Sequence, residues 1–263
     1  MVKVLVSGAL GRMGSMICEG VAAAGDMELA GGVDPMAAVD ATVCGRPVYA
    51  ALADGIAALA PDVVVDFTRP DVAQANVACA LSAGVNVVLG TTGLSEERLQ
   101  AVYDEAHAGD AALFHAPNFT TGAVLMMLFS ATAAKYFPDA EVIELHHDGK
   151  KDAPSGTAVR TAKMIAAAKA KPSGAPGRET ELSGFEGARG ALVDGVPVHS
   201  VRTAGHVAHQ EVVFGSPGQT LTIRHDSIDR TSYLPGILLA VRSVGQLSGC
   251  VVGLEKLMMD TTI

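Results

Sequence analysis

The sequence has little of several features that mark particular classes of protein. It has no tryptophan, aromatic residues make up 4% of it, and only 18% of its 263 residues are charged, with a formal net charge of −9. An acidic chain of this kind lacks the basic surface that binds nucleic acid or an anionic membrane. No apolar run reaches the roughly 18 residues of a membrane-spanning helix. We therefore expect no nucleic-acid or membrane partner, and small anions must be held by local groups.

Cysteine is also scarce, and its pattern is uninformative for metal binding. Cys18, Cys44, Cys79 and Cys250 are far apart and form no metal-ligand spacing. The simplest interpretation is four buried thiols. The chain begins with the strand-like run MVKVLVSG, which does not resemble a signal peptide. Together these features predict a cytoplasmic location.

What the sequence does contain is a regular alternation of apolar runs and alanine-rich helical patterns. Short apolar runs at 2–7, 29–33, 63–67, 85–89 and 111–115 alternate with helical patterns such as 13–24, 72–83 and 95–106. Continuous apolar strands that alternate with helices are typical of a parallel sheet covered on both faces. The first part of the chain is therefore predicted to be an α/β, doubly wound domain.

The pattern changes after about residue 118. An apolar helix is expected at 122–136, a strand at 140–146, a helix after Ser155, and extended runs at 198–202, 210–214 and 219–225, the last two joined as a hairpin through GSPG. The intervening segment 171–197 is rich in Gly and Pro and is predicted to be a long loop. We expect a second, α+β domain over 121–230, with residues 1–120 and 231–263 forming the first.

The turn VSGALGRMG lies between the first strand and the first helix. Gly8, Gly11 and Gly14 would let the backbone approach a pyrophosphate at the positive end of that helix. Asp34 follows the second strand, where a carboxylate can accept hydrogen bonds from ribose hydroxyls. A glycine turn without ligand is the alternative. However, DFTRP (66–70), GTTG (90–93) and HAPNF (115–119) also follow predicted strands, and four such turns at one sheet edge favour a bound dinucleotide.

The stretch ELHHDGKKDAPSGTA (144–158) concentrates titratable groups. Strand alternation places Glu144 and His146 on one face and His147 on the other. Histidine is the natural proton donor or acceptor near neutral pH, and Lys150 adds a positive charge. Ser155 is then expected at a helix N-cap, which leaves the backbone N–H groups of Gly156 and Thr157 for a carboxylate.

Two alternatives stay open at these positions. A solvated loop with an ordinary serine cap would account for Asp148 and Lys151, but less well for the two histidines and Lys150. The pair His206 and His209 suggests a metal site, but no third acidic or cysteine ligand is near in the sequence, so we interpret it as structural and expect no metal.

These motifs together resemble the dihydrodipicolinate reductase family of lysine and diaminopimelate biosynthesis. The resemblance runs through GALGRMG, VVDFTRP, LGTTG, APNF, ELHHDGKKDAPSGTA, HSVRTAGHVAHQEVVFG and LTIRHDSIDRTSYLPG, which together span nearly the whole chain. It implies a Rossmann-like domain completed by the C-terminal segment, and a second domain that binds the substrate and assembles a homotetramer. It also implies that a nicotinamide cofactor reduces a small cyclic dicarboxylate imine.

The resemblance also implies roles for individual residues. His146 would be the proton donor and acceptor, Lys150 a second proton donor, and His147, Ser155, Gly156 and Thr157 the substrate-binding group. The cofactor would be lined by Gly8, Ala9, Leu10, Gly11, Arg12, Met13, Asp34, Gly90, Thr91, Thr92, Ala116, Pro117, Asn118 and Phe119.

Asp34 followed by Pro35 favours NADH over NADPH, although Arg12 could offset part of the repulsion of a 2′-phosphate, so both cofactors are expected to work. Two competing hypotheses remain: another oxidoreductase that acts on an amino acid, and a catalytically silent NAD-binding sensor.

Overall fold

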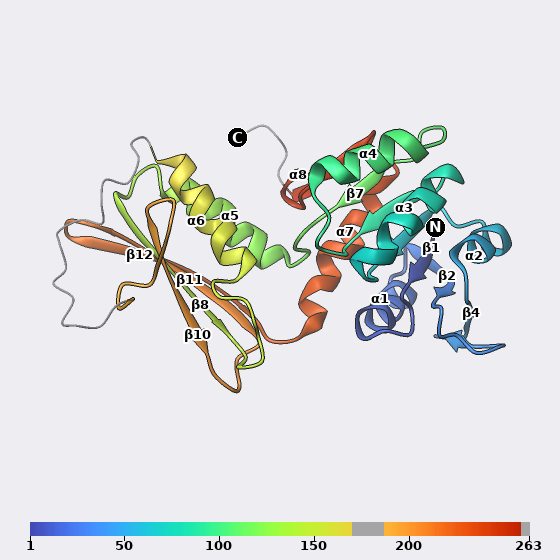
Figure 1. The fold of residues 1–263 in the computed structure, drawn as a ribbon, viewed down its shortest axis with the longest axis horizontal. Coiled ribbons are helices and arrows are strands. Elements are labelled where there is room, and N and C mark those ends of the chain that lie inside the picture. Colours follow the sequence, from blue (N-terminus) through green and yellow to red (C-terminus); the bar gives the residue numbers. More distant parts are fainter. Residues whose placement is uncertain (170–186, 259–263) are drawn as a thin grey trace. The chain divides into compact units, whose positions relative to one another are not determined.

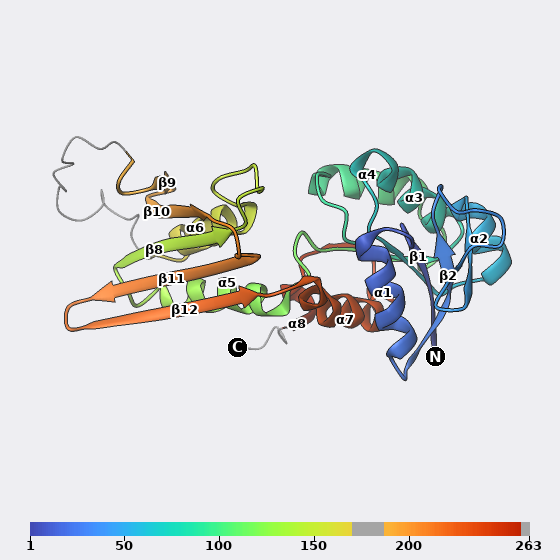
Figure 2. The ribbon, with the colours of Figure 1, turned by 90° about the horizontal axis from the view of Figure 1, so that it is seen from below.

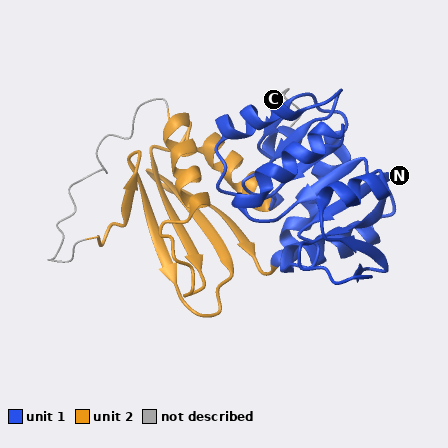
Figure 3. Ribbon diagram, turned by 45° about the vertical axis from the view of Figure 1, so that its right-hand side comes forward, with its two compact units in different colours: residues 1–121, 230–263 blue, residues 122–229 orange. Residues whose placement is uncertain are grey.

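A computed structural model describes residues 1–169 and 187–258, and the chain in it divides into two compact units. Unit 1 comprises Met1–Thr121 and Arg230–Ile263, and unit 2 comprises Gly122–Asp229. Figure 3 shows that unit 1 is made from both ends of the chain and unit 2 from its middle. The limits expected from the sequence differ from these by one residue at each join. No helix among the described residues is long and apolar enough to cross a membrane.

Unit 1 is built on an eight-stranded sheet in the order β13-β7-β6-β5-β1-β2-β4-β3. All neighbouring strands are parallel except β3 and β4. The strands are β1 (Val2–Ser7), β2 (Met27–Val33), β3 (Thr42–Val43), β4 (Arg46–Tyr49), β5 (Val63–Asp66), β6 (Asn86–Leu89), β7 (Leu113–His115) and β13 (Cys250–Val252).

Helices cover both faces of this sheet, as Figures 1 and 2 show. The helices α1 (Arg12–Ala23) and α7 (Leu234–Val244) contact each other, and α3 (Pro70–Ser82) contacts both α2 (Leu52–Leu59) and α4 (Glu96–Ala106). One core cluster joins the strands to α2, α3 and α4 and includes Leu5, Val64, Val77 and Leu99, each at most 1% exposed. A short 3-10 helix η1 (Arg230–Tyr233) precedes α7, and α8 (Glu255–Met258) closes the described chain.

The predicted doubly wound fold is confirmed, including all five expected strands and the return of the C-terminal segment. The sequence analysis missed β3, β4, α2 and β13. These elements are short, at two to eight residues, and give little periodicity. The three strands among them extend the sheet at its two ends and leave its central strands unchanged.

Unit 2 contains a five-stranded mixed sheet in the order β12-β11-β8-β10-β9. Its strands are β8 (Asp139–His146), β9 (Ala191–Val193), β10 (Val196–Arg202), β11 (Ala208–Ser216) and β12 (Gln219–Ser227), and its helices are α5 (Thr121–Ala133) and α6 (Gly156–Ala168). Only β10 and β8 pair in parallel. Alternate residues of the strands, such as Val142, Val198 and Phe214, are buried with Ala158, Ala162 and Ile165 of α6. This confirms the expected α+β class.

Two expectations about this chain were wrong. The loop predicted over 171–197 contains β9 and the start of β10, because Gly195 at φ +84° permits a tight turn between Val193 and Val196. Residues 171–186 of that prediction lie outside the described residues. The cysteines are also not uniformly buried: Cys18 is, and burial raises its pKa to about 12, but Cys44 is exposed. All four are free thiols.

Candidate functional site

The glycine turn of unit 1 leaves no room for a side chain at Gly8 or Gly14. A Cβ atom on Gly14 would lie 2.0 Å from the carbonyl oxygen of Gly8, so α1 begins directly against the turn. Gly8 has φ +81° and faces Phe67, whose carbonyl oxygen would lie 3.2 Å from an added Cβ. This close packing is what a backbone needs in order to approach a pyrophosphate.

The N-terminus of α1 has the properties of an anion site. Its N-cap is Gly11, which supplies no side-chain hydrogen bond, and its first turn contains no acidic residue. The N–H groups of the first turn, with the positive end of the helix dipole, therefore face the turn without an internal anion. These residues fit the pyrophosphate of a dinucleotide.

Asp34 lies beside this turn at the end of β2. Its Oδ2 accepts a hydrogen bond from the backbone N–H of Leu10 at 3.2 Å, and its Oδ1 accepts one from that of Met36 at 3.0 Å. The residue is 9% exposed. Each carboxylate oxygen keeps a further lone pair, so ribose hydroxyls can still be bound.

The other three turns lie along the same sheet edge. Ser7, Asp66, Leu89 and His115 are register partners across β1, β5, β6 and β7, so the segments that follow them start side by side. The structure thus brings together the turns at Gly8, Phe67, Gly90 and Ala116.

Asp66 joins two of these turns, its own and the one at Gly90. Its fully buried carboxylate accepts hydrogen bonds from the hydroxyls of Thr68 at 2.8 Å and Thr91 at 3.0 Å, and from the Asn76 amide at 2.8 Å. The Thr91 hydroxyl, predicted to line the cofactor, therefore already donates to Asp66. Sequence analysis noted the DFTRP turn but missed Asp66 as the residue that joins it to the next turn.

The remaining predicted cofactor residues differ in exposure. Leu10, Arg12, Thr92 and Pro117 are exposed, and Met13, Gly90 and Asn118 are partly exposed. Ala9 and Ala116 are buried. Phe119 is 1% exposed, and its ring packs near those of Phe67 and Phe114, so its side chain lies in the core and only its backbone is left to contact a cofactor.

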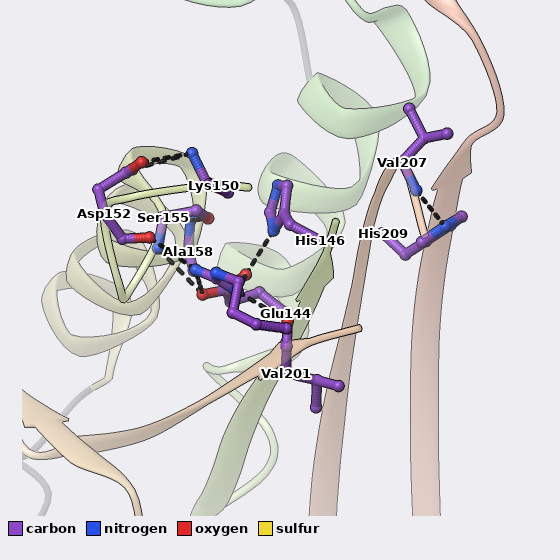
Figure 4. A network of polar contacts seen from close by, with 10 residues as sticks. Glu144, His146, Lys150, Asp152, Ser155, Ala158, Val201, Val207 and His209 are labelled. Atoms are coloured by element: carbon purple, nitrogen blue, oxygen red, sulfur yellow. Dashed lines mark hydrogen bonds and ion pairs between the residues drawn. The ribbon is translucent and has the colours of Figure 1, made fainter. Parts of the chain in front are cut away.

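The second candidate site is the end of β8 and the start of α6 in unit 2, drawn in Figure 4. The Nδ1 atom of His146, the last residue of β8, lies 2.5 Å from Oε2 of Glu144. Burial, and to a smaller extent the charges of Lys150 and Arg202, lower the pKa of His146, although Glu144 acts in the opposite direction. Burial therefore favours the neutral form of the ring.

Lys150 follows in the loop after β8. Its Nζ atom donates to both carboxylate oxygens of Asp152, at 2.7 and 2.9 Å. The side chain of Lys150 is 22% exposed and that of Asp152 is 59% exposed, so this pair faces solvent. His147 is exposed beyond the end of the strand.

The start of α6 presents backbone N–H groups where the sequence predicts an anion hole. Ser155 is the N-cap, and its Oγ accepts a hydrogen bond from the N–H of Ala158 at 3.2 Å. The N–H groups of Gly156 and Thr157 have no acceptor among the described residues, and the first turn contains no acidic side chain. No heavy atom of another part of the described chain lies within 4 Å of the position that a Cβ on Gly156 would take. A carboxylate can therefore reach both donors.

Two charged residues of this site were missed by the sequence analysis. Glu144 is 0% exposed, and Arg202 of β10 donates to both of its oxygens at 2.8 Å. Strand alternation already placed Glu144 beside His146, which was a usable signal. Arg202 is 58 residues away in sequence, and only strand pairing brings it there.

The rings of His206 and His209 contact each other, and His209 has further polar contacts. His209 places Nδ1 2.7 Å from a carboxylate oxygen of Asp226, and its Nε2 accepts a hydrogen bond from the N–H of Val207 at 3.2 Å. No group of three or more His, Cys, Asp or Glu in the described parts of the chain could hold a metal ion.

Comparisons with known proteins agree with this geometry. Residues 2–119 match the family model described as dihydrodipicolinate reductase, N-terminus, and residues 122–258 match the model of its C-terminus. The chain belongs to the dihydrodipicolinate reductase family. The predicted resemblance is therefore confirmed over almost the full length.

Individual members of the family are close in sequence and structure. The chain is 49% identical to the 4-hydroxy-tetrahydrodipicolinate reductase of Mycobacterium sp. (strain KMS), over 97% of this chain and 98% of that one. It is 46% identical to the enzyme of that name from Desulfitobacterium hafniense (strain DSM 10664 / DCB-2), with the same coverage. The solved structure of dipicolinate-bound dihydrodipicolinate reductase from Paenisporosarcina sp. TG-14 superposes with a TM-score of 0.88 at 40% identity, covering 97% of this chain and 99% of that one.

This member of the family is an oxidoreductase that reduces 4-hydroxy-tetrahydrodipicolinate, a step of lysine and diaminopimelate biosynthesis. Its N-terminal Rossmann-like unit binds the nicotinamide cofactor, and its substrate is a small dicarboxylate. The competing amino-acid dehydrogenase and silent-sensor hypotheses are thereby set aside.

Proposed function

We propose that His146 exchanges a proton with the substrate ring while Lys150 and the start of α6 hold the substrate carboxylates. The observation that carries this proposal is the pair of N–H groups at Gly156 and Thr157, which have no acceptor among the described residues and follow directly after the His146–Lys150 segment. When bound, the reduced nicotinamide supplies the hydride. The chain's own residues supply proton exchange, charge complementarity and orientation.

His147 and Ser155 would complete the substrate-binding group in this proposal. His147 is exposed and can donate to a carboxylate, whereas Ser155 is 3% exposed and uses its hydroxyl to cap α6. We therefore assign Ser155 the task of keeping the neighbouring N–H groups in place. The solved relative carries dipicolinate in its name, and we propose that this planar dicarboxylate also binds here.

The test combines turnover and inhibition. Purified protein mixed with NADH and the condensation product of pyruvate and aspartate semialdehyde should consume NADH, measured by absorbance, and dipicolinate should compete with the substrate. Thr157→Val should lower the affinity for dipicolinate if the Thr157 hydroxyl also contacts it. Thr42→Val, a matched change at an exposed residue of unit 1 outside the predicted site, should leave dipicolinate affinity unchanged. A Thr157→Val protein with unchanged inhibitor affinity would exclude the side chain and leave only the backbone donor.

We further propose that NADH is bound more tightly than NADPH. The buried carboxylate of Asp34 can accept hydrogen bonds from ribose hydroxyls, and its negative charge repels a 2′-phosphate. Arg12 is exposed beside the glycine turn and can offset part of this repulsion. We expect a difference of about tenfold in Kd, which corresponds to ~1.4 kcal/mol.

Titration of both cofactors tests this preference. Asp34→Ala should narrow or reverse it, and Arg12→Ala should widen it. Tighter binding of NADPH by the unmodified protein would refute the assignment of Asp34 as the discriminating residue.

We also propose a homotetramer assembled through unit 2. The sheet face that alternates with the core-facing residues carries the partly buried apolar side chains of Ile143, Leu145, Val201 and Val213. Light scattering should give four times the chain mass of 26.8 kDa. Val213→Asp should lower that mass while NADH binding by unit 1 is retained, and an unchanged mass would place the interface elsewhere.

The free thiols and the use of a reduced nicotinamide support a cytoplasmic location.

A further inference from the structure

The carboxylate of Glu144 accepts more hydrogen bonds than any neighbouring group of the proton-transfer site. It lies inside β8 at 0% exposure. Arg202 donates from Nη1 to Oε2 and from Nη2 to Oε1, each at 2.8 Å, and the backbone N–H of Ser155 donates to Oε1 at 3.2 Å. With His146 at 2.5 Å from Oε2, both oxygens are shared between the ring, the guanidinium and the start of α6 (Figure 4).

Arg202 reaches this carboxylate because of strand pairing. In the parallel pair of β8 and β10, Arg202 is the register partner of His146, and Ser200 is that of Glu144. The guanidinium also donates to the backbone carbonyl oxygens of Val201 at 2.8 Å and Asp152 at 2.7 Å. Arg202 is thereby held in one orientation between two elements.

The charges that face His146 come from several elements. Glu144 lies on its own strand, Lys150 and Asp152 in the loop that follows, and Arg202 on β10, while β11 presents only Ala208 opposite the histidine. A buried carboxylate with no cation beside it would hold the ring in its protonated form. The bidentate guanidinium offsets part of that influence, and the Glu144 oxygen also acts on His146 as a hydrogen-bond acceptor.

The consequence concerns the tautomer of the ring. An ionised carboxylate has no proton to donate, so the short contact requires a proton on Nδ1 of His146. In the neutral ring the free lone pair is then on Nε2, and in the protonated ring Nε2 carries the proton that can be transferred.

We propose that Glu144, neutralised by Arg202, is a positioning residue that fixes the His146 ring with Nε2 free for proton exchange and ties that ring to the start of α6. This inference rests on the proposed role of His146 as proton donor. It goes beyond that role because it says that Glu144 and Arg202 together determine the tautomer, the orientation and the charge of the ring. The hydrogen bond from the N–H of Ser155 links the same carboxylate to the start of α6. Glu144 therefore holds in place both the His146 ring and the N–H groups proposed to bind the substrate carboxylate.

The experiment compares Glu144→Gln, Arg202→Met, Arg202→Lys and the double variant Glu144→Gln/Arg202→Met. The tautomer and pKa of His146 are read from the ring nitrogen shifts of histidine-labelled protein without substrate, with His146→Gln used to assign the signal. Arg242→Met, which removes an arginine from an exposed ion pair with Asp26 in unit 1, is the matched control.

Opposite effects are expected from the two single changes. Arg202→Met leaves the carboxylate uncompensated, so it should raise the pKa of His146 and move the pH profile of kcat to higher pH. Glu144→Gln removes the acceptor charge and leaves the cation, so it should lower that pKa, loosen the tautomer and reduce kcat by roughly 10²- to 10⁴-fold, with a smaller change in KM. Arg202→Lys should lie closer to the unmodified protein than Arg202→Met does.

Unchanged tautomer and pH profile in the folded variants would overturn the proposal and leave the pair a purely structural role. Should a single variant fail to fold, the double variant decides, because loss of both charges removes the unpaired ion. Its ring should lose the fixed tautomer, and retention of the tautomer would refute the inference. Because the nitrogen shifts need no substrate, they separate this outcome from failure of the proposed function, which would appear as absence of NADH consumption by the unmodified protein.

Discussion

Replacing Gly14 with alanine should damage the cofactor site more than the stability of the fold. An added Cβ would lie 2.0 Å from the carbonyl oxygen of Gly8 and 2.8 Å from the Cα of Ala9. Both atoms belong to the backbone, so the turn itself must move by about 1 Å or more to restore an ordinary contact. The turn is the part of unit 1 that has to approach the pyrophosphate.

The expected magnitudes follow from two opposing terms. Overpacking of a well-packed site costs about 1–3 kcal/mol, and alanine in place of glycine in a helix gains about 1 kcal/mol. The free energy of unfolding should therefore fall by at most about 2 kcal/mol. Loss of one hydrogen bond to a charged phosphate costs about 1.5–3 kcal/mol, so the Kd for NADH should rise roughly ten- to hundredfold.

Urea denaturation and fluorescence titration with NADH measure the two quantities. Gly25→Ala is the control, because no atom lies within 4 Å of the position of its added Cβ and the residue is outside the turn. That variant should bind NADH like the unmodified protein. A Gly14→Ala protein with unchanged NADH affinity would refute the idea that this turn must keep its present shape to hold the cofactor.

Three further predictions concern unit 2. His146→Gln should keep NADH affinity and lower kcat by roughly 10²-fold or more, and steady-state rates that do not change would remove His146 from the mechanism. Lys150→Ala should raise the KM for the dianionic substrate. Asp152→Asn frees the Lys150 ammonium and should lower that KM by about two- to fivefold, the scale of an exposed ion pair. If both changes moved KM in the same direction by the same amount, Asp152 would not compete with the substrate for Lys150. Burial raises the pKa of Glu144, but hydrogen bonds from Arg202, Ser200 and His146 lower it more, so its folded-state pKa is below 4.5. Its stabilising contribution is therefore complete above that pH and is lost as pH falls through the folded-state pKa. Urea midpoints measured from pH 7 down to the acid range should show this loss of stability. The double variant Glu144→Gln/Arg202→Met should not show it.

The order of elements in unit 1 could be predicted because it depends on local pattern. Each central strand is a short apolar run ended by glycine or a polar turn, and each helix has its own periodicity. The short strands β3, β9 and β13 could not be found in this way, since two or three residues carry no period and pair only because a neighbouring strand is present.

The residues of the candidate site also fall into those whose place could be predicted from sequence and those whose place could not. The positions of Gly8 in the turn, Asp34 after β2, His146 at the end of β8 and Ser155 as the cap of α6 could be predicted from sequence, because each depends on the residue type and its place next to a strand or helix end. Phe119 was grouped with the cofactor residues by sequence position, but its ring lies in the core. Sequence position alone does not say which way a side chain points.

What the sequence by itself determined is the set of chemical groups and their local setting: a glycine turn before a helix, a histidine at a strand end, and free N–H groups at a helix start. What only the tertiary structure decided is the pairing of groups far apart in the chain. Arg202 meets Glu144 across 58 residues because β8 and β10 pair in one register, and Asp66 meets Thr91 because β5 and β6 are neighbours. The physical reason is that hydrogen bonds act over about 3 Å, and strand order and register alone bring such distant residues within that distance.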